Sequence, residues 1–247
     1  MLTAILTDLH ANREAVTACL GSAEQRGAER YVFLGDLVGY GADPAWVVDT
    51  VRTYVECGAL AVCGNHDEAT VQEAREQMHP EARAAIAWTR SRLNSDQLGF
   101  LRNLPFTASD NECLYVHAEA SQPREWSYVL GPQEAMLSIL GTGSRITFCG
   151  HVHEPALYEL APNGEISASM PEAGNAIALH AHRRWLAVIG SVGQPRDANP
   201  AACYALYDDE ASELTYVRVP YDHATTANKI RAAGLPDFFA YRLALGI

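Results

Sequence analysis

The sequence predicts an α/β fold in which two packed sheets are flanked by helices, and three observations predict it. Short apolar segments alternate with amphipathic helical patterns in the first third of the chain, which is typical of parallel strands joined by crossover helices. After residue 153 the pattern changes to short strands separated by turn residues, which indicates a second, antiparallel sheet. The length of 247 residues and the absence of linker-like tracts in the sequence favour one domain over residues 1–247.

The first third contains three buried strand patterns, at residues 4–6, 31–34 and 60–63. Between the first two, apolar residues from Val16 to Ala23 repeat at helical spacing, and Gly27 is placed to end that helix. Asp43-Pro44 is a favourable helix start, with the aspartate as cap and the proline at the first helical position. These segments give the order β-α-β-α-β.

Residues 66–103 contain no strand pattern, and we interpret them as a helical insertion in which Pro80 opens one helix. Strands resume at 114–116 and 146–149. A helix is predicted between them, at 132–141. We assign both strands to the parallel sheet.

The C-terminal part of the chain supplies the second sheet. Its strands are expected at residues 156–160, 165–169, 185–189, 204–207 and 214–219. The segment that follows predicts helices, which Gly234 and Pro236 interrupt.

Charge and segment composition limit the class of partner. The net charge is −12, and an acidic surface repels polyanions, so we expect no nucleic-acid partner. No apolar stretch approaches the roughly 20 residues of a membrane span, and the N-terminus has no signal-peptide pattern. We therefore expect a cytoplasmic protein without a membrane partner, and its oligomeric state is left open.

Each strand that we assign to the parallel sheet is followed directly by polar residues. In chain order these are Asp8 and His10, then Asp36, then Asn65 and His66, then His117, and finally His151 and His153. The spacings Asp8 to Asp36 and Asp36 to Asn65 are 28 and 29 residues, close to the roughly 30 residues of one β-α-β unit. Because the carboxyl ends of such strands meet at one edge of a sheet, we expect these side chains to converge.

Two carboxylates, one amide oxygen and four imidazoles among these residues form a mixed oxygen and nitrogen set. Such a set suits first-row divalent cations rather than calcium, and it lacks the thiolates of structural zinc sites. Seven ligands exceed the need of one tetrahedral ion, so we expect two ions that share a bridging carboxylate and a bridging hydroxide. The site then stays net positive and attracts a small phosphorylated substrate.

The series Asp-x-His, Gly-Asp, Gly-Asn-His-Asp, His and Gly-His-x-His spans residues 8–153 and resembles the calcineurin-like metallophosphoesterase superfamily. Segments 35–41 and 190–197 resemble a small bacterial branch of it, which also resembles a retromer subunit. The resemblance implies a four-layer α/β/β/α sandwich of two mixed sheets flanked by helices. It also implies a hydrolase that acts on phosphate ester bonds.

The resemblance also implies roles for single residues. The first metal ion is held by Asp8, His10 and His153, Asp36 bridges both ions, and the second ion is held by Asn65, His117 and His151. His66 is implied as the catalytic acid that donates a proton to the leaving group. Two divalent metal ions are thus expected as cofactors, manganese first, with iron, zinc, nickel or magnesium as alternatives.

The sequence departs from the family pattern after Asp36. Gly39-Tyr40 stands where phosphoprotein phosphatases carry Asp-Arg, so the usual carboxylate partner of His66 and one phosphate-binding arginine are missing. Phosphoprotein phosphatase activity is therefore not expected. We expect Arg124, seven residues after His117, to restore a phosphate contact, since arginine matches phosphate geometry.

Three further residues have competing interpretations. Asn12 is a candidate substrate contact, but capping of the first helix is the stronger alternative. Asp67 either orients His66 or caps the helical insertion, and the sequence does not decide between these roles. We interpret Arg196, in Gln-Pro-Arg-Asp, as a turn residue rather than a substrate contact.

The predicted function is hydrolysis of a small phosphomonoester or phosphodiester through a dinuclear, metal-bridged hydroxide. A nuclease would share this chemistry, but the sequence has no cluster of lysine or arginine for a basic groove. A non-catalytic metal-binding scaffold of the same fold is the other alternative. The presence of His66 and of all seven expected ligands favours the enzyme.

Overall fold

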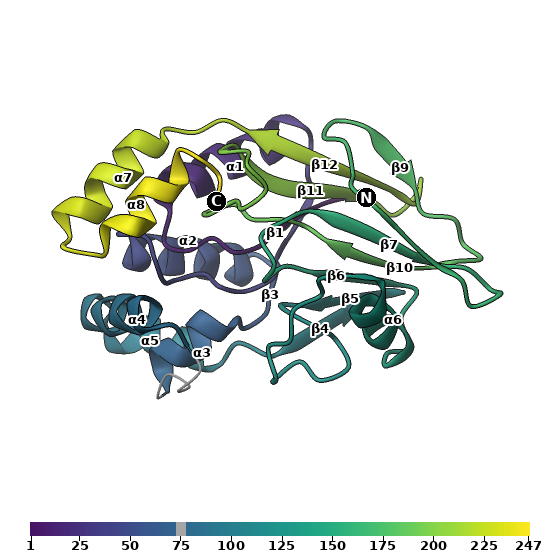
Figure 1. The fold of residues 1–247 in the computed structure, drawn as a ribbon, viewed down its shortest axis with the longest axis horizontal. Helices are drawn as coiled ribbons and strands as arrows, with labels where there is room; N and C mark the ends of the chain where they lie inside the picture. Colours follow the sequence, from purple (N-terminus) through teal and green to yellow (C-terminus); the bar gives the residue numbers. More distant parts are fainter. Residues whose placement is uncertain (73–77) are drawn as a thin grey trace.

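The described part of the chain, residues 1–72 and 78–247 of the computed structural model, contains two six-stranded mixed sheets and eight helices (Figure 1). The two sheets pack face to face, and helices cover their outer faces, as the predicted four-layer sandwich requires. No helix among the described residues combines the length and the apolar character that a bilayer crossing needs.

The first sheet has the order β3-β2-β1-β11-β12-β9. Strands β1, β2 and β3 pair in parallel, whereas β11 pairs antiparallel with β1 and continues antiparallel through β12 to β9. The bounds are β1 Leu2–Leu6, β2 Arg30–Phe33, β3 Leu60–Ala61, β9 Ala176–Ala178, β11 Ala202–Asp208 and β12 Glu213–Val219.

The second sheet has the order β4-β5-β6-β10-β7-β8. Strands β5, β6 and β10 pair in parallel, and the pairs at both edges are antiparallel. The bounds are β4 Thr107–Asp110, β5 Cys113–Val116, β6 Ile146–Cys149, β7 Ala156–Leu160, β8 Ile166–Ser169 and β10 Arg184–Val188.

The predicted strands form, but their division between the sheets was predicted wrongly. Strands β5 and β6 belong to the second sheet, and β11 and β12 belong to the first. Apolar periodicity identifies a strand but not the edge with which it pairs. The edge of β1 opposite β2 is filled by β11, with Ile5 opposite Ala205, so each sheet is mixed rather than wholly parallel or wholly antiparallel.

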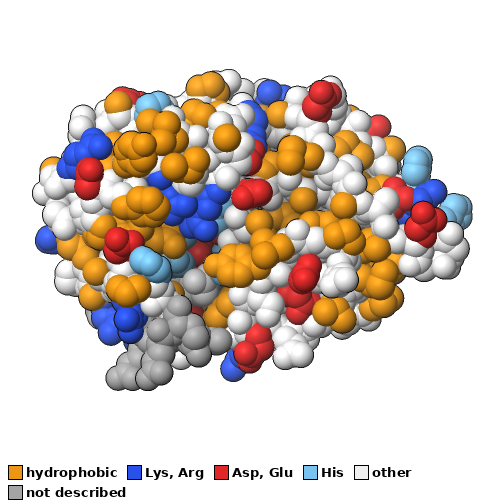
Figure 2. Space-filling model, viewed as in Figure 1, with side chains coloured by type: hydrophobic (Ala, Val, Ile, Leu, Met, Phe, Trp, Pro, Cys, Tyr) orange, Lys and Arg blue, Asp and Glu red, His pale blue; other side chains and the backbone are white. Residues whose placement is uncertain are grey.

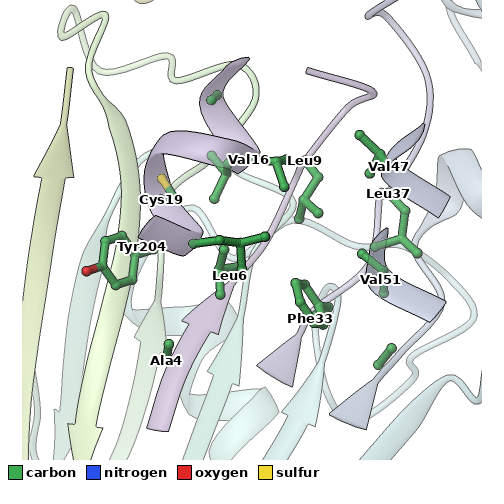
Figure 3. Close-up of a cluster of buried hydrophobic side chains, with 14 of the residues drawn as sticks. Ala4, Leu6, Leu9, Val16, Cys19, Phe33, Leu37, Val47, Val51 and Tyr204 are labelled. Carbon is green, nitrogen blue, oxygen red and sulfur yellow. The ribbon is translucent and has the colours of Figure 1, made fainter. Parts of the chain in front are cut away.

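The outer helices bury their apolar faces on the sheets. Helices α1 (Arg13–Gln25) and α2 (Pro44–Glu56) pack on the first sheet, and α6 (Pro132–Leu140) packs on the second. Figure 3 shows Leu6 and Phe33 pointing from the sheet toward Val16 of α1 and Val51 of α2. Burial of one such side chain contributes about 1.5–3 kcal/mol.

Strand β1 is buried on both faces. Ala4 and Leu6 contact the helix layer, while Ile5, between them, belongs to the core that the two sheets share. The period of two along a strand explains this alternation, and burial on both faces explains why the segment is apolar throughout.

Two helical groups flank the ends of the strands. Helices α3 (Asn65–Val71), α4 (Pro80–Arg92) and α5 (Ser95–Arg102) form the segment between β3 and β4, and residues 73–77 lie outside the described part. Helices α7 (His223–Ala232) and α8 (Asp237–Leu243) form a C-terminal hairpin. Asp43 makes no side-chain cap bond to α2, because its carboxylate accepts from Lys229 of this hairpin at 2.8 Å.

Candidate metal centre

The polar residues that follow five strands come together between the two sheets. Strands β1, β2 and β3 of the first sheet and β5 and β6 of the second all end at this place. Within residues 1–72 and 78–247, three groups of side chains could each hold a metal ion, with ligand atoms within 4.8 Å of one another. They are Asp8, His10 and His153; Asp36, His117 and His151; and His10, Asp36 and His66.

Asp36 lies between the first two groups. Its Oδ2 is 3.6 Å from His10 Nε2 and 3.4 Å from His117 Nε2. On the first side, His153 Nε2 is 3.2 Å from Asp8 Oδ1 and 3.2 Å from His10 Nε2. The aspartate expected to bridge two ions is thus placed where one oxygen faces both groups.

Asn65 completes the second group. Its Oδ1 is 3.2 Å from His117 Nε2, and the same ring nitrogen is 3.1 Å from His151 Nδ1. The structure therefore brings together all seven side chains that the sequence singles out as metal ligands.

Main-chain carbonyl groups fix the tautomer of the four histidines. One ring nitrogen of each faces a carbonyl oxygen at 2.6–3.2 Å and must donate to it: His10 to Val38, His117 to Leu34, His151 to Trp126 and His153 to Gln194. The other ring nitrogen then presents a lone pair to the cluster. Carbonyl-anchored imidazoles of this kind are typical around protein-bound metal ions.

Among the described residues, several ligand atoms of the cluster lack a hydrogen-bond partner, and a bound cation would take the place of that partner. The two lone pairs on His10 Nε2 and His153 Nε2 face each other, and Asp8 Oδ1 is buried with no hydrogen-bond partner. Such groups are costly unless a cation satisfies them. The residues present therefore fit a divalent metal ion.

Burial and charge set the protonation states that metal binding needs. Burial lowers the pKa of His10 well below its usual value, that of His151 to about 3, and that of His153. Burial raises the pKa of Asp36, but His117 and His66 outweigh it and hold that pKa well below its usual value. Neutral imidazoles beside ionised carboxylates are the forms that bind cations.

His117 differs from the other three histidines. Burial lowers its pKa, but the Asp36 carboxylate outweighs burial and raises the pKa to about 9. A proton on His117 therefore offsets negative charge in the cluster. A cation replaces that proton when the site is loaded, because ligands must be deprotonated.

The backbone around the cluster is strained. A positive φ, between 46° and 67°, occurs at five of the seven expected ligands, namely Asp8, His10, Asp36, His151 and His153. Each such residue costs roughly 1–2 kcal/mol relative to a right-handed conformation. Neighbouring glycines allow the close approach, since a Cβ on Gly150 would lie 2.4 Å from Asp8 Oδ2. Strain of this kind gathers at functional sites.

Asp67 has a structural role in this arrangement. Its Oδ1 accepts from the N–H groups of Leu37 and Val38 at 2.9 and 3.2 Å, and its Oδ2 accepts from Gly64 at 3.0 Å. It therefore caps α3 and holds the loop after Asp36 to the loop that carries Asn65. Of the two roles considered from the sequence, capping is the one that these contacts support.

His66 lies beside the cluster, and its ring has no carboxylate partner among the residues that the structure describes. Its main-chain N–H donates to Asp36 Oδ1 at 2.8 Å, and its Nδ1 is buried with no hydrogen-bond partner. The Tyr40 ring lies 4.5 Å from the His66 ring. Tyr40 thus occupies the place of the missing Asp-Arg pair, and burial lowers the pKa of His66 to about 4 although Asp36 raises it.

A cavity of about 530 Å³ opens beside the cluster. Aromatic and charged residues from several loops contribute to its lining, including Asp36, Tyr40, Asn65, His66, His79, Trp126, Tyr128, His151, His153 and Arg196. Figure 2 shows Lys and Arg side chains gathered in a hollow near a histidine on this face. Volumes of this size suit small-molecule ligands.

The two expected substrate contacts lie elsewhere. Neither Asn12 nor Arg124 is among the residues that line this cavity. Asn12 is buried, caps α1 by accepting from Ala15 at 3.1 Å, and donates to Gly193 O at 2.8 Å. The Arg124 guanidinium lies 4.2 Å from the centre of the Phe106 ring.

Among the lining residues that sequence reasoning missed, Tyr40, Tyr128 and Arg196 place polar groups at the cavity. These residues come from three loops, and no spacing rule relates them. The interpretation of Arg196 as a turn residue accounts for its backbone, whose N–H donates to His153 O at 3.2 Å, but not for its side chain. This hydrogen bond to His153 joins residues 43 positions apart, so the sequence did not indicate it.

Comparisons with known proteins give the family of the chain. The family model described as the calcineurin-like phosphoesterase superfamily domain matches residues 1–212. An uncharacterised protein of Methanocaldococcus jannaschii is 32% identical over 250 residues, which cover 99% of this chain and 98% of that protein.

Two crystal structures share the fold over the whole length. A metallophosphoesterase from Sphaerobacter thermophilus is 32% identical with a TM-score of 0.89, covering 100% of this chain and 99% of that one. A hypothetical protein from Pyrococcus horikoshii is 18% identical with a TM-score of 0.80, covering 100% and 98%. From the family match and these likenesses, we conclude that the chain belongs to the calcineurin-like phosphoesterase superfamily.

Proposed function

We propose that this chain hydrolyses a small phosphomonoester or phosphodiester with two divalent cations bound between its sheets. The observation that carries the proposal is the convergence of two ligand groups on one oxygen of Asp36, beside a cavity sized for a small molecule. Carboxylates and tautomerically fixed imidazoles of this kind are typical of hydrolytic metal centres.

Each candidate ligand has a defined task in this proposal. Asp8, His10 and His153 would hold one cation, Asn65, His117 and His151 would hold the other, and Asp36 is placed to serve both groups. When bound, the cations would supply Lewis acidity and an activated water for displacement at phosphorus. The buried surroundings keep the ligand imidazoles oriented and exclude competing water.

His66 is the proposed proton donor to the leaving group. It lines the cavity, and its ring lies 5.0 Å from the His10 ring. A phosphate ester bound beside the cluster would bring negative charge to this imidazole and favour its protonated form. No carboxylate of the described residues holds the buried Nδ1, so the Tyr40 ring positions His66 by packing.

The test compares metal-stripped and manganese-restored protein on p-nitrophenyl phosphate and on its bis-ester. We expect metal-dependent turnover, about two bound ions per chain, and a loss of roughly 10²–10⁴ in kcat for His66→Ala. His182→Ala, at an exposed position, is the matched control and should keep wild-type kcat. Protein that binds no stoichiometric manganese, or a His66→Ala variant with wild-type kcat, would contradict the proposal.

The two alternatives make different predictions in the same experiment. A scaffold would bind metal and turn over neither ester. A nuclease would cleave oligonucleotides better than either ester, although the net charge of −12 opposes binding of a polyanion.

A further inference from the structure

Two arginines beside the metal centre share one neutral acceptor. Arg196 Nη2 donates to Gln194 Oε1 at 3.2 Å, and Arg242 Nη1 donates to the same oxygen at 3.1 Å. Gln194 is 1% exposed, so this acceptor is fixed in the protein. Two positive groups are therefore held side by side, one from the loop after β10 and one from α8.

Arg196 has no carboxylate partner among the described residues. Among the described residues, no aspartate or glutamate oxygen lies within 4.0 Å of either guanidinium. Among the same residues, Arg196 Nε is buried and has no hydrogen-bond partner, whereas Arg242 Nε donates to an oxygen of Ile247, the last residue in the sequence. Burial first, and then the Arg196 charge, lower the pKa of Arg242 to about 10, so Arg242 stays charged at neutral pH.

Several other arginines in the chain are paired with carboxylates. Ion pairs with carboxylates hold Arg30, Arg145, Arg218 and Arg231. Two partly buried like charges are unfavourable side by side, and Arg196 faces no aspartate or glutamate among the described residues that would offset this. A site of this kind gains free energy when it receives an anion.

The pair lies next to the candidate metal centre. Arg196 lines the cavity together with Asp36, His66 and His153. The Tyr40 ring lies between the arginine pair and the metal centre. Its centre is 5.9 Å from the Arg196 guanidinium carbon and 4.5 Å from the His66 ring. Arg242 is not among the lining residues, so it acts from behind Arg196.

We propose that Arg196, supported by Arg242, forms a subsite for a second phosphate group of the substrate. The inference rests on the proposed function, because it places the scissile phosphate at the metal centre and the second phosphate at Arg196. A guanidinium matches the geometry of phosphate oxygens and stays charged when buried. The substrate class is then a small ester that carries two phosphate groups, rather than a simple monoester.

The first experiment measures inhibition of p-nitrophenyl ester turnover by orthophosphate and by pyrophosphate, at a fixed concentration of free manganese. We expect wild-type protein to bind pyrophosphate at least about tenfold more tightly than orthophosphate, as one charge-assisted hydrogen bond allows. Arg196→Gln should bring the ratio of the two inhibition constants toward one. Arg242→Gln should lower this ratio by a smaller factor, and Arg196→Lys should retain part of the preference for pyrophosphate.

Arg231→Gln is the matched control. Like Arg242→Gln, it removes one positive charge from the hairpin of α7 and α8, but Arg231 forms an exposed ion pair with Asp237. It should leave the ratio at the wild-type value. An unchanged ratio in Arg196→Gln, or an equal loss in Arg231→Gln, would overturn the inference. Arg196→Lys keeps the inference testable if the glutamine variant does not fold.

A second measurement needs no turnover. Tripolyphosphate should raise the Tm of metal-stripped wild-type protein, and it should raise that of Arg196→Gln much less. If neither ester is hydrolysed but this difference is found, the proposed function fails and the anion subsite remains. If the esters are hydrolysed but wild type and Arg196→Gln respond alike to both anions, the subsite fails and the proposed function remains.

Discussion

At the scale of single residues, the candidate ligands depend on glycines that lie directly against them. A Cβ on Gly64 would lie 2.2 Å from both the main-chain nitrogen and Oδ1 of Asp36. The glycines in Gly-Asp, Gly-Asn-His and Gly-His-x-His therefore do more than permit turns. They let three loops approach one another closely enough for the ligand atoms to meet.

This close approach predicts different outcomes for two glycine substitutions. Gly64→Ala should lower the free energy of unfolding by about 1–3 kcal/mol through overpacking, and it should reduce the manganese bound per chain. Gly21→Ala is the control, because it lies within α1 with no atom within 4 Å of its new Cβ, and it should stabilise the protein by up to about 1 kcal/mol. Urea unfolding and metal analysis measure both. Equal metal content and stability in the two variants would show that the loops tolerate a side chain.

Sequence alone predicts part of the site at this scale. The candidate ligands could be identified because each follows a strand, and strand ends are fixed by local patterns. Arg196 and Tyr40 could not be identified as cavity residues, because the cavity forms where loops distant in sequence meet. Arg124 was singled out by its spacing from His117, but spacing along a loop does not determine which way a side chain points.

At the scale of secondary-structure elements, the C-terminal hairpin of α7 and α8 supports one side of the cavity. Phe239 of α8 packs 4.7 Å from the Tyr40 ring, and Tyr40 in turn packs against His66. Lys229 of α7 pairs with Glu14 of α1 and with Asp43, which precedes α2. The hairpin thus joins the outer helices to the loop after Asp36.

Two neighbouring phenylalanines of α8 allow a matched test of this support. Phe239 is 3% exposed and Phe238 is 47% exposed. Phe239→Ala should destabilise the protein by about 3–5 kcal/mol and weaken ester turnover, because Tyr40 and His66 lose their packing. Phe238→Ala should cost under about 1 kcal/mol, chiefly a contact with Arg242. Urea midpoints and kcat/KM measure both, and similar losses in the two variants would contradict this role of Phe239.

The elements that sequence reasoning missed are both edge strands. Strand β4, Thr107–Asp110, is polar and half exposed, and β9, Ala176–Ala178, has only three residues. Neither carries the β-branched or alternating signal that identifies buried strands. Both strands form because a neighbouring strand, β5 for β4 and β12 for β9, supplies hydrogen bonds. The residues of the segment do not reveal this pairing.

At the scale of the whole molecule, the two sheets are joined by a shared core and by the candidate metal centre. The core between them includes Ile5 of the first sheet and Phe148 of the second, and the Tyr216 hydroxyl of β12 donates to Ala156 O of β7 at 3.0 Å. At the metal centre, Asp8 Oδ2 accepts from the His151 N–H at 3.0 Å. Neither sheet can lose its partner without exposing this surface to water.

This coupling predicts that residues 1–247 unfold as one unit. Trp46 lies on α2 of the first sheet's helix layer, and Trp185 lies on β10 of the second sheet. Two variants, each retaining only one of these tryptophans, should give coincident urea midpoints by fluorescence, because a shared core transmits unfolding between the layers. Manganese should raise both midpoints equally, since its ligands come from loops of both sheets and it binds only when both are folded. If the Trp46 variant unfolded first, or if manganese shifted only one midpoint, the two sheets would be separate folding units and the metal centre would belong to one of them.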